Sequence, residues 1–413
     1  MRFLVRAVAA LGVPLAILGA CHGATDPGTP PSDPWAKLTM DDGVTDYPSW
    51  GGLDLLRDQV GALHLVVVEH EYGKLQYGEC TTSCDHRGGW TLTTVDSGPY
   101  QGLGENASSV LTPSSIVTVY EDQPGGVATY QLKLATCSAD CAIGTNWQKT
   151  DLFSGELDGW QDPIHSRDLA VDPSGGLHML YRDTSWGIWY ASCASGCATA
   201  GSWHQLHLET SPSFALYQGS NAAIAVDSHS AIHVLLRTSD TTQSLVYLEC
   251  ATQCDSTANW GSVVLAHGGT GFEPALTTSG SRVAVAFRDP VRAGYTTALH
   301  FGRCDSSCTN AGSWTMQSPG IDAGYDVALA FDAAGRPWLA TNHGTASYYN
   351  GSTLLARCSL TCASAGDWSA LTIDSLGDGG GVSFVFDAAG LPRLAVSGMG
   401  VHYAQTADST LFR

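Results

Sequence analysis

Residues 304–314 read CDSSCTNAGSW, and this spacing of two cysteines and a tryptophan decides the fold. The pattern C-x3-C-x5-W occurs six times in the chain, at Cys80, Cys84 and Trp90; Cys137, Cys141 and Trp147; Cys193, Cys197 and Trp203; Cys250, Cys254 and Trp260; Cys304, Cys308 and Trp314; and Cys358, Cys362 and Trp368. The first cysteines of successive units lie 57, 56, 57, 54 and 54 residues apart. That length accommodates one four-stranded sheet with its connections.

The unit around Cys193 shows four expected strands, which we call a, b, c and d. Residues 169–172 (LAVD) form a short apolar strand a, 173–176 (PSGG) a turn, and 177–182 (LHMLYR) an alternating strand b. Strand c is expected over 187–193 (GIWYASC) and strand d over 203–208 (WHQLHL). The order a-b-c-d then begins again in the next unit.

The turn between strands a and b recurs as DSHSA at 227–231, DAAGR at 332–336 and DAAGL at 387–391. Aspartate caps such a turn through its side chain, and glycine accepts a positive φ. A calcium site is the alternative interpretation, but one carboxylate per turn supplies too few oxygen ligands. We therefore predict a structural turn.

The two ends of the chain give the number of units. After the sixth cysteine unit the sequence supplies strands a, b and c at 382–387, 392–397 and 401–406, and then ends without a strand d. Residues 35–41 (WAKLTMD) match the d strands at 368–374 (WSALTID) and 90–96 (WTLTTVD). Pairing 35–41 with 401–406 closes a ring and removes the open sheet edges. The sequence thus predicts an all-β protein, a seven-bladed β-propeller with four strands per blade, over residues 34–413; a linear stack of small sandwiches explains neither end.

The thirteen cysteines divide into Cys21 and the six local pairs. In an exported protein, pairs of fixed local spacing predict disulfides, here at the mouth of each c-to-d hairpin. Zinc is the competing interpretation, but a structural zinc site needs four ligands. The incomplete seventh unit has no c-to-d hairpin and needs no such pair.

The N-terminus predicts export. Arg2 and Arg6 precede an apolar run, residues 7–20, that contains Pro14 and is too short to span a bilayer, so we interpret residues 1–20 as a signal peptide. The sequence LGAC at 18–21 resembles the lipobox of bacterial lipoproteins, which implies that Cys21 is acylated; cleavage of an ordinary signal peptide is the alternative. Residues 21–33 are then the lipidated cysteine and a flexible tether. We expect an exported protein held at the outer membrane or surface of a bacterium by lipid alone.

Charge and motifs exclude several functions. The formal net charge of −20 repels phosphate backbones, so we expect no nucleic-acid partner. The sequence has no G-x-S-x-G elbow, phosphate loop or dinucleotide fingerprint, and its histidines are not set at metal-ligand spacing. We expect neither a cofactor nor a metal, and a monomer.

The turn followed by tryptophan, as in CTNAGSW at 308–314 and CASAGDW at 362–368, resembles the sialidase-like and BNR-repeat propellers over residues 34–406. The Asp-box of that family, Ser-x-Asp-x-Gly-x-x-Trp, is absent, and cysteines occupy its place. The resemblance therefore implies architecture. Propellers commonly place function around the central channel, on the face that carries the d-to-a and b-to-c connections.

Polar groups end the predicted b strands, and aromatic residues punctuate the d-to-a connections. The b strands end in Glu69-His70, Glu121-Asp122, Arg182-Asp183, Arg237, Arg288-Asp289 and Asn342-His343. The aromatic residues are Tyr47, Trp50, Tyr100, Trp160, Tyr217, Phe272 and Tyr325. Aromatic faces beside charged groups suit sugar rings or peptide side chains. The candidate ligand-binding residues are Glu121, Asp122, Arg182, Asp183, Arg237, Arg288, Asp289, Trp50, Trp160 and Tyr217; the alternative is a solvated rim with aromatics packed between blades.

Three function classes follow from this ring of residues. The first is a recognition module that binds a carbohydrate or an envelope or extracellular protein. The second is a glycoside hydrolase of sialidase type, in which Arg182, Arg237 and Arg288 clamp a carboxylate, and in which Tyr181, Glu121, Asp183 or Asp289 acts as nucleophile or acid. The third is a structural scaffold that makes contacts through its sides or lower face. The catalytic residues, if any, are not identified by the sequence.

Overall fold

The computed structural model describes residues 34–41, 52–69, 73–98, 103, 107–122, 129–156, 168–182, 188–209, 222–238, 244–268, 271–289, 297–324, 326–343, 352–359, 361–373, 381–398 and 400–412. Residues Trp35–Arg413 form one compact unit. The predicted signal peptide, Cys21 and the tether lie outside the described ranges. Within those ranges, there is no helix of the length and apolar character needed to cross a bilayer.

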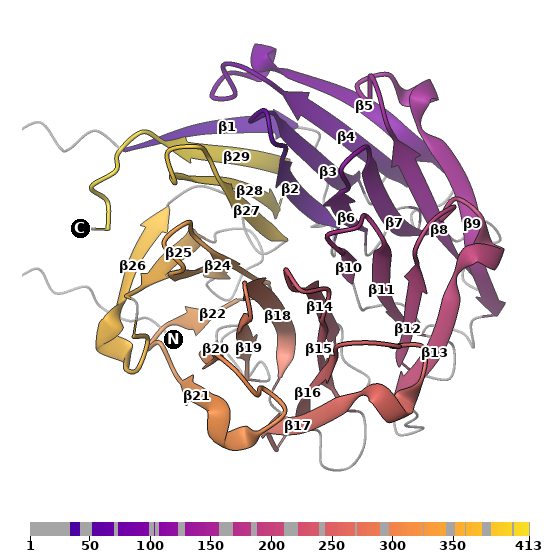
Figure 1. The fold of residues 1–413 in the computed structure, drawn as a ribbon. Coiled ribbons are helices and arrows are strands. Elements are labelled where there is room, and N and C mark those ends of the chain that lie inside the picture. Colours follow the sequence, from indigo (N-terminus) through magenta and orange to yellow (C-terminus); the bar gives the residue numbers. More distant parts are fainter. Residues whose placement is uncertain are drawn as a thin grey trace, which may run out of the picture. The chain divides into compact units, whose positions relative to one another are not determined.

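The compact unit is a seven-bladed β-propeller, as predicted (Figure 1). Each blade is an antiparallel sheet whose strands follow one another in the order a, b, c, d from the centre outward. The inner strands a are β2 (Leu53–Arg57), β6 (Ser108–Leu111), β10 (Asp168–Val171), β14 (Ala222–Val226), β18 (Phe272–Ser279), β23 (Val327–Phe331) and β27 (Val382–Phe386). Each inner strand contacts the next, and β27 contacts β2, so that the ring closes around a central channel.

The remaining strands complete blades 1 to 7 in the same order. Strands b are β3 (Leu63–Glu69), β7 (Ile116–Asp122), β11 (Leu177–Arg182), β15 (Ile232–Arg237), β19 (Arg282–Arg288), β24 (Pro337–His343) and β28 (Pro392–Gly398). Strands c are β4 (Lys74–Cys80), β8 (Thr129–Cys137), β12 (Ile188–Cys193), β16 (Leu245–Cys250), β20 (Thr297–Cys304), β25 (Ser352–Cys358) and β29 (Gly400–Thr406). Strands d are β5 (Trp90–Ser97), β9 (Gln148–Glu156), β13 (His204–Glu209), β17 (Gly261–Ala266), β21 (Trp314–Gln317), β26 (Trp368–Ile373) and β1 (Trp35–Asp41).

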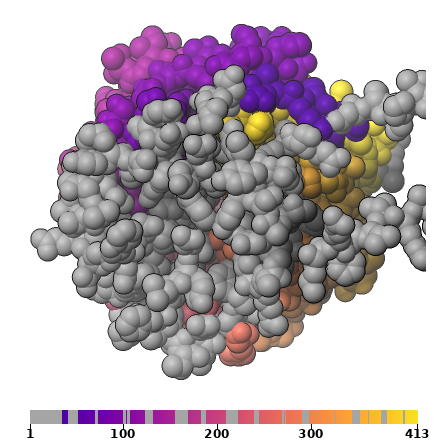
Figure 2. All heavy atoms as spheres, turned by 180° about the vertical axis from the view of Figure 1, so that it is seen from behind, coloured from indigo at the N-terminus to yellow at the C-terminus, as the bar shows by residue number. Residues whose placement is uncertain are grey.

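Blade 7 joins the two ends of the described chain. Strand β1 pairs antiparallel with β29, with Trp35 opposite Thr406 and Leu38 opposite Tyr403, which confirms the predicted closure. Seen from behind, the indigo residues of the N-terminal strands lie beside the yellow C-terminal residues (Figure 2). The ring therefore has no blade with a missing outer strand.

The turns between strands a and b define what we call the lower face. In blade 3, Asp172 accepts hydrogen bonds through Oδ1 from the backbone N–H of Ser174 and Gly176, both at 2.8 Å, and Gly175 has φ +91°. The same two bonds recur at Asp58, Asp227, Asp332 and Asp387. The turn interpretation is confirmed, because these carboxylates satisfy backbone donors.

The c-to-d hairpins share the lower face, and all six predicted disulfides are present. The Cα atoms of each pair are 5.7 Å apart, a distance typical of disulfides. In five hairpins the tryptophan Nε1–H donates to the carbonyl of the second cysteine, for example from Trp314 to Cys308 at 2.7 Å. The disulfide and this hydrogen bond thus fix the hairpin to the start of strand d.

The same tryptophans hold neighbouring blades together. The ring of Trp147 in blade 2 packs edge-on against Tyr77 of blade 1, with centroids 5.2 Å apart. Equivalent pairs are Trp90 with Tyr403, Trp260 with Tyr190, Trp314 with Tyr247 and Trp368 with Phe301. Such pairs contribute about 0.5–1.5 kcal/mol each beyond the burial of their area.

Three features of the described chain were not predicted. A short 3-10 turn precedes each d strand of blades 1 to 6, such as η6 (Ala311–Ser313). In blade 5 the outer position is shared by β21 and a second short strand, β22 (Asp322–Ala323), which also pairs with β20. After β29 the chain returns to blade 6, where Phe412 packs on Trp338 with centroids 4.7 Å apart.

Candidate binding site at the upper end of the channel

We call the opposite end of the sheets, where strands a begin and strands b end, the upper face. The antiparallel order of the strands brings the predicted b-strand residues to this end. Glu121, Asp122, Arg237, Arg288 and Asp289 are described there. The side chain of Arg182, and Asp183, Trp50, Trp160 and Tyr217, lie outside the described part of the chain, so their predicted roles stay predictions.

The described arginines are buried. Arg237 is 5% exposed, and burial lowers the pKa of its guanidinium. Arg288 is 2% exposed, and its Nη2 lies 3.6 Å from Oε1 of Glu273, which is itself buried. A carboxylate this close partly compensates the guanidinium charge. The structure thus pairs Arg288 with a carboxylate of the same sheet, on strand β18.

The described carboxylates at the strand ends also have local partners. Asp122 pairs with Lys133 at 3.1 Å, and Lys133 in turn pairs with Asp96 of blade 1 at 2.8 Å. Burial acts to raise the pKa of Asp96, but hydrogen bonds from Lys133, Lys149 and Tyr120 prevail and lower it. This network joins blade 1 to blade 2. Glu121 is completely buried.

Asp289 differs from these groups because it remains partly exposed. Its Oδ1 lies 3.0 Å from Nε2 of His300 on strand c of the same blade, and about a third of each side chain is accessible to solvent. Its backbone N–H donates to Ala298 at 3.2 Å. Asp289 is therefore available at the upper face, while its orientation is restricted by His300.

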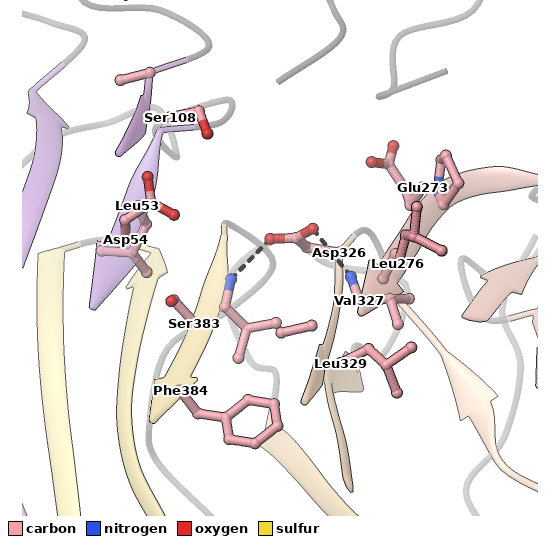
Figure 3. Close-up of a pocket in the computed structure, with 15 residues that line it drawn as sticks. Leu53, Asp54, Ser108, Glu273, Leu276, Asp326, Val327, Leu329, Ser383 and Phe384 are labelled. Atoms are coloured by element: carbon pink, nitrogen blue, oxygen red, sulfur yellow. Dashed lines mark hydrogen bonds between the residues drawn. The ribbon is translucent and has the colours of Figure 1, made fainter. Parts of the chain in front are cut away.

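A cavity of about 230 Å³ lies among the upper ends of five inner strands (Figure 3). Strands β2, β6, β18, β23 and β27 contribute to its wall, so that it occupies the central channel. Asp54, Glu273 and Asp326 project around the same space (Figure 3). Asp54 lies on β2, Glu273 lies on β18, and Asp326 directly precedes β23. The lining residues are Leu53, Asp54, Ala107, Ser108, Glu273, Pro274, Ala275, Leu276, Asp326, Val327, Ala328, Leu329, Val382, Ser383 and Phe384.

Asp326 fixes the wall of this cavity between two blades. Its Oδ1 accepts from the backbone N–H of Val327 at 3.0 Å, and its Oδ2 accepts from the N–H of Val382 at 2.8 Å. Val382 begins the inner strand of blade 7, whereas Val327 belongs to blade 6. The carboxylate therefore has a defined position beside the cavity, as the dashed lines in Figure 3 show.

Two serines line the cavity and link other pairs of blades. The Oγ of Ser383 accepts from the N–H of Leu55 at 3.0 Å, and the Oγ of Ser108 accepts from the N–H of Leu169 at 3.1 Å. A hydroxyl that accepts such a bond retains its own proton for donation. Both serines thus offer a hydrogen-bond donor beside the carboxylates, which are acceptors.

The cavity residues were not predicted from the sequence, although a signal for them exists. Asp54, Ala328 and Ser383 each lie four residues before the aspartate that caps the a-to-b turn. Because successive side chains of a strand point to opposite faces, residues at this fixed offset from the aspartate lie on the same face of each inner strand. Glu273 and Asp326 lie two positions earlier in the same repeat.

Among the described residues, there is no cluster of three or more His, Cys, Asp or Glu side chains that could hold a metal ion.

Comparison with known proteins identifies the fold and no family. No family model and no curated protein matches the sequence. Solved structures do match. A fungal alcohol oxidase in complex with copper has 8% identity and a TM-score of 0.54, over 90% of this chain and 75% of that one. Hydrazine synthase from Kuenenia stuttgartiensis has 11% identity and a TM-score of 0.52, over 88% and 97% of the two chains. The α-L-arabinanase of Penicillium chrysogenum, complexed with arabinobiose, has 10% identity and a TM-score of 0.48, over 90% and 97%.

Proposed function

We propose that this propeller recognises a carbohydrate at the upper end of its central channel and that it catalyses no reaction on it. The observation that supports the proposal is the cavity of about 230 Å³, whose wall combines carboxylates, serine hydroxyls and apolar side chains. Pockets that enclose drug-sized ligands have volumes of about 300–1,000 Å³. A smaller cavity suits a single sugar ring at the end of a glycan.

The chemistry of the wall fits that ligand. A sugar ring presents hydroxyl groups at its edge and C–H groups on its faces. Asp54 and Asp326 provide acceptors for hydroxyl protons, and Ser108 provides a donor. Val327, Leu329 and Phe384 add apolar surface lower in the cavity. Buried polar groups of fixed position then select the orientation of the ring.

The proposal includes display on the cell envelope. Acylation of Cys21 would hold the propeller at the outer membrane or cell surface of a bacterium, and residues 22–33 would act as the tether. A glycan on a neighbouring cell or polymer is then the expected partner. A protein partner is the outcome to consider if no glycan binds.

A glycan array tests the proposal, with purified residues 34–413, which contain the whole compact unit. Ala328→Phe should abolish binding because the added ring fills the cavity. Ala363→Phe is the matched control, since Ala363 is exposed in the blade 6 hairpin at the lower face. Binding that survives Ala328→Phe, in a variant whose unfolding temperature is unchanged, would place the ligand elsewhere. Product analysis on every bound glycan would reveal hydrolysis and contradict the non-catalytic assignment.

A further inference from the structure

We infer that the sugars recognised at this site are uncharged or carry an amino group, and that carboxylated and sulfated sugars are excluded. The inference rests on the proposed function, carbohydrate recognition at the cavity, and specifies which class of sugar is bound there. It differs from the expectation of a sialidase-type clamp, in which three arginines hold a sugar carboxylate.

The charge of the cavity wall carries the first step. Three of its described residues are acidic, namely Asp54, Glu273 and Asp326, and the described wall contains no Lys, Arg or His. Arg288 compensates Glu273 at 3.6 Å, but Arg288 is 2% exposed and is not a lining residue. An anionic ligand in the cavity would therefore meet carboxylates before it meets a guanidinium.

The buried arginines carry the second step. A clamp for a sugar carboxylate needs guanidinium groups that reach the ligand with two parallel N–H donors. Arg288 is directed toward Glu273, and Arg237 is only 5% exposed. To reach a ligand in the cavity, Arg288 would have to leave Glu273, and Arg237 would have to leave its buried position. Arg288 thus compensates one carboxylate of the wall, and neither Arg237 nor Arg288 presents an exposed guanidinium to a ligand.

The size of the effect follows from Coulomb's law. Two like charges about 8 Å apart, at an effective dielectric constant of about 40, weaken binding on the order of threefold to tenfold. Several carboxylates at such distances reject an anionic sugar by a larger factor, and they attract an ammonium group by a comparable one. Salt reduces both effects, because the Debye length is about 10 Å at 0.1 M ionic strength.

The test compares glycans of equal length that differ only in charge. Neutral oligosaccharides, their amino-sugar counterparts and uronate or sialylated counterparts are titrated against residues 34–413 by isothermal calorimetry at 20 and 300 mM salt. The Asp54→Asn variant removes one charge at nearly constant shape and leaves intact the two backbone hydrogen bonds that Asp326 accepts. Asp140→Asn is the matched control, since Asp140 is exposed in the Cys137–Cys141 hairpin at the lower face.

The outcomes separate the inference from the proposed function. Tight binding of neutral or amino sugars, with acidic counterparts at least tenfold weaker, supports the inference. The inference also requires this discrimination to shrink in the Asp54→Asn variant and at high salt, and to persist in Asp140→Asn. Acidic sugars that bind as well as neutral ones would overturn the inference and leave carbohydrate recognition intact. Failure of every glycan to bind would overturn the proposed function and the inference with it.

Discussion

Replacing Trp314 by phenylalanine tests how the hairpins are attached to the blades. In the native structure its Nε1–H donates to the carbonyl of Cys308 at 2.7 Å, and its ring packs 5.0 Å from that of Tyr247. Trp368 occupies the same position in blade 6 and packs 5.0 Å from Phe301. Its Nε1 has no hydrogen-bond partner within the described residues. The two substitutions therefore remove the same atoms, but only one of them removes a hydrogen bond.

The difference between the two variants isolates that bond. Loss of a hydrogen bond that leaves a buried carbonyl unsatisfied costs about 1–3 kcal/mol. The smaller ring weakens packing in both variants and largely cancels in the comparison. An unfolding entropy of about 2.1 cal/mol/K per residue converts this cost into a melting temperature roughly 1–4 °C lower for Trp314→Phe than for Trp368→Phe.

Calorimetry and urea denaturation of the oxidised proteins provide the measurement. The free energy of unfolding of Trp314→Phe should be lower than that of Trp368→Phe by both methods. Equal losses would refute the reasoning, because the bond between the indole and the cysteine carbonyl would then contribute nothing to stability. A larger loss in Trp368→Phe would show that packing at this position varies more between blades than the ring distances indicate.

Three further predictions concern stability. Burial lowers the pKa of His178 and His233, so the unfolded chain binds more protons than the folded chain just below pH 6.5. The free energy of unfolding should therefore fall as the pH is lowered from 7.5 to 5. Replacing both histidines by glutamine should flatten that dependence in urea titrations. Lys133→Met should cost about 3 kcal/mol, because it removes the ion pair of Asp122 and one of the two lysines that pair with Asp96, whereas Lys149→Met, at a side chain that is 40% exposed, should cost less than about 1 kcal/mol; similar urea midpoints for the two variants would contradict this. Replacing one hairpin's cysteine pair by alanines should cost about 2 kcal/mol, since each disulfide closes a loop with a sequence separation of only 4, and an unchanged urea midpoint would show that the turn holds without it.

The fold was predictable because its determinants are local and repeated. The cysteine and tryptophan spacing fixes the c-to-d hairpin, aspartate fixes the a-to-b turn, and Trp35 matches the repeat as an isolated strand d. Features that break the repeat were missed for the same reason. Strand β22 depends on how residues 318–321 bend after β21, and no periodic pattern specifies that bend.

The candidate site was predictable only in its location. The b-strand ends do lie at the upper face, but the described groups there acquire partners that sequence spacing does not reveal. Lys133 reaches Asp122 from the neighbouring strand, and Glu273 reaches Arg288 from the other side of a β-hairpin. The cavity residues were missed because the candidates were sought at the ends of strands b and in the d-to-a connections, and not at the beginning of strands a. The seven inner strands converge on the central channel, and the few polar side chains at their upper ends therefore come close together there.

The closure of blade 7 connects the chain ends to the site. Val382 and Ser383 of β27 line the cavity, and β27 is held through β28 and β29 by β1, a strand from the opposite end of the chain. No disulfide staples this blade; its outer strand is instead anchored by Trp35, in an apolar cluster that includes Leu355 and Phe412. Because the N–H of Val382 donates to Asp326, loss of β1 would loosen a sheet that positions one wall of the cavity. The apolar packing of the two chain ends thus replaces, in blade 7, the covalent bracing of the other six blades, and the geometry of the proposed site depends on it.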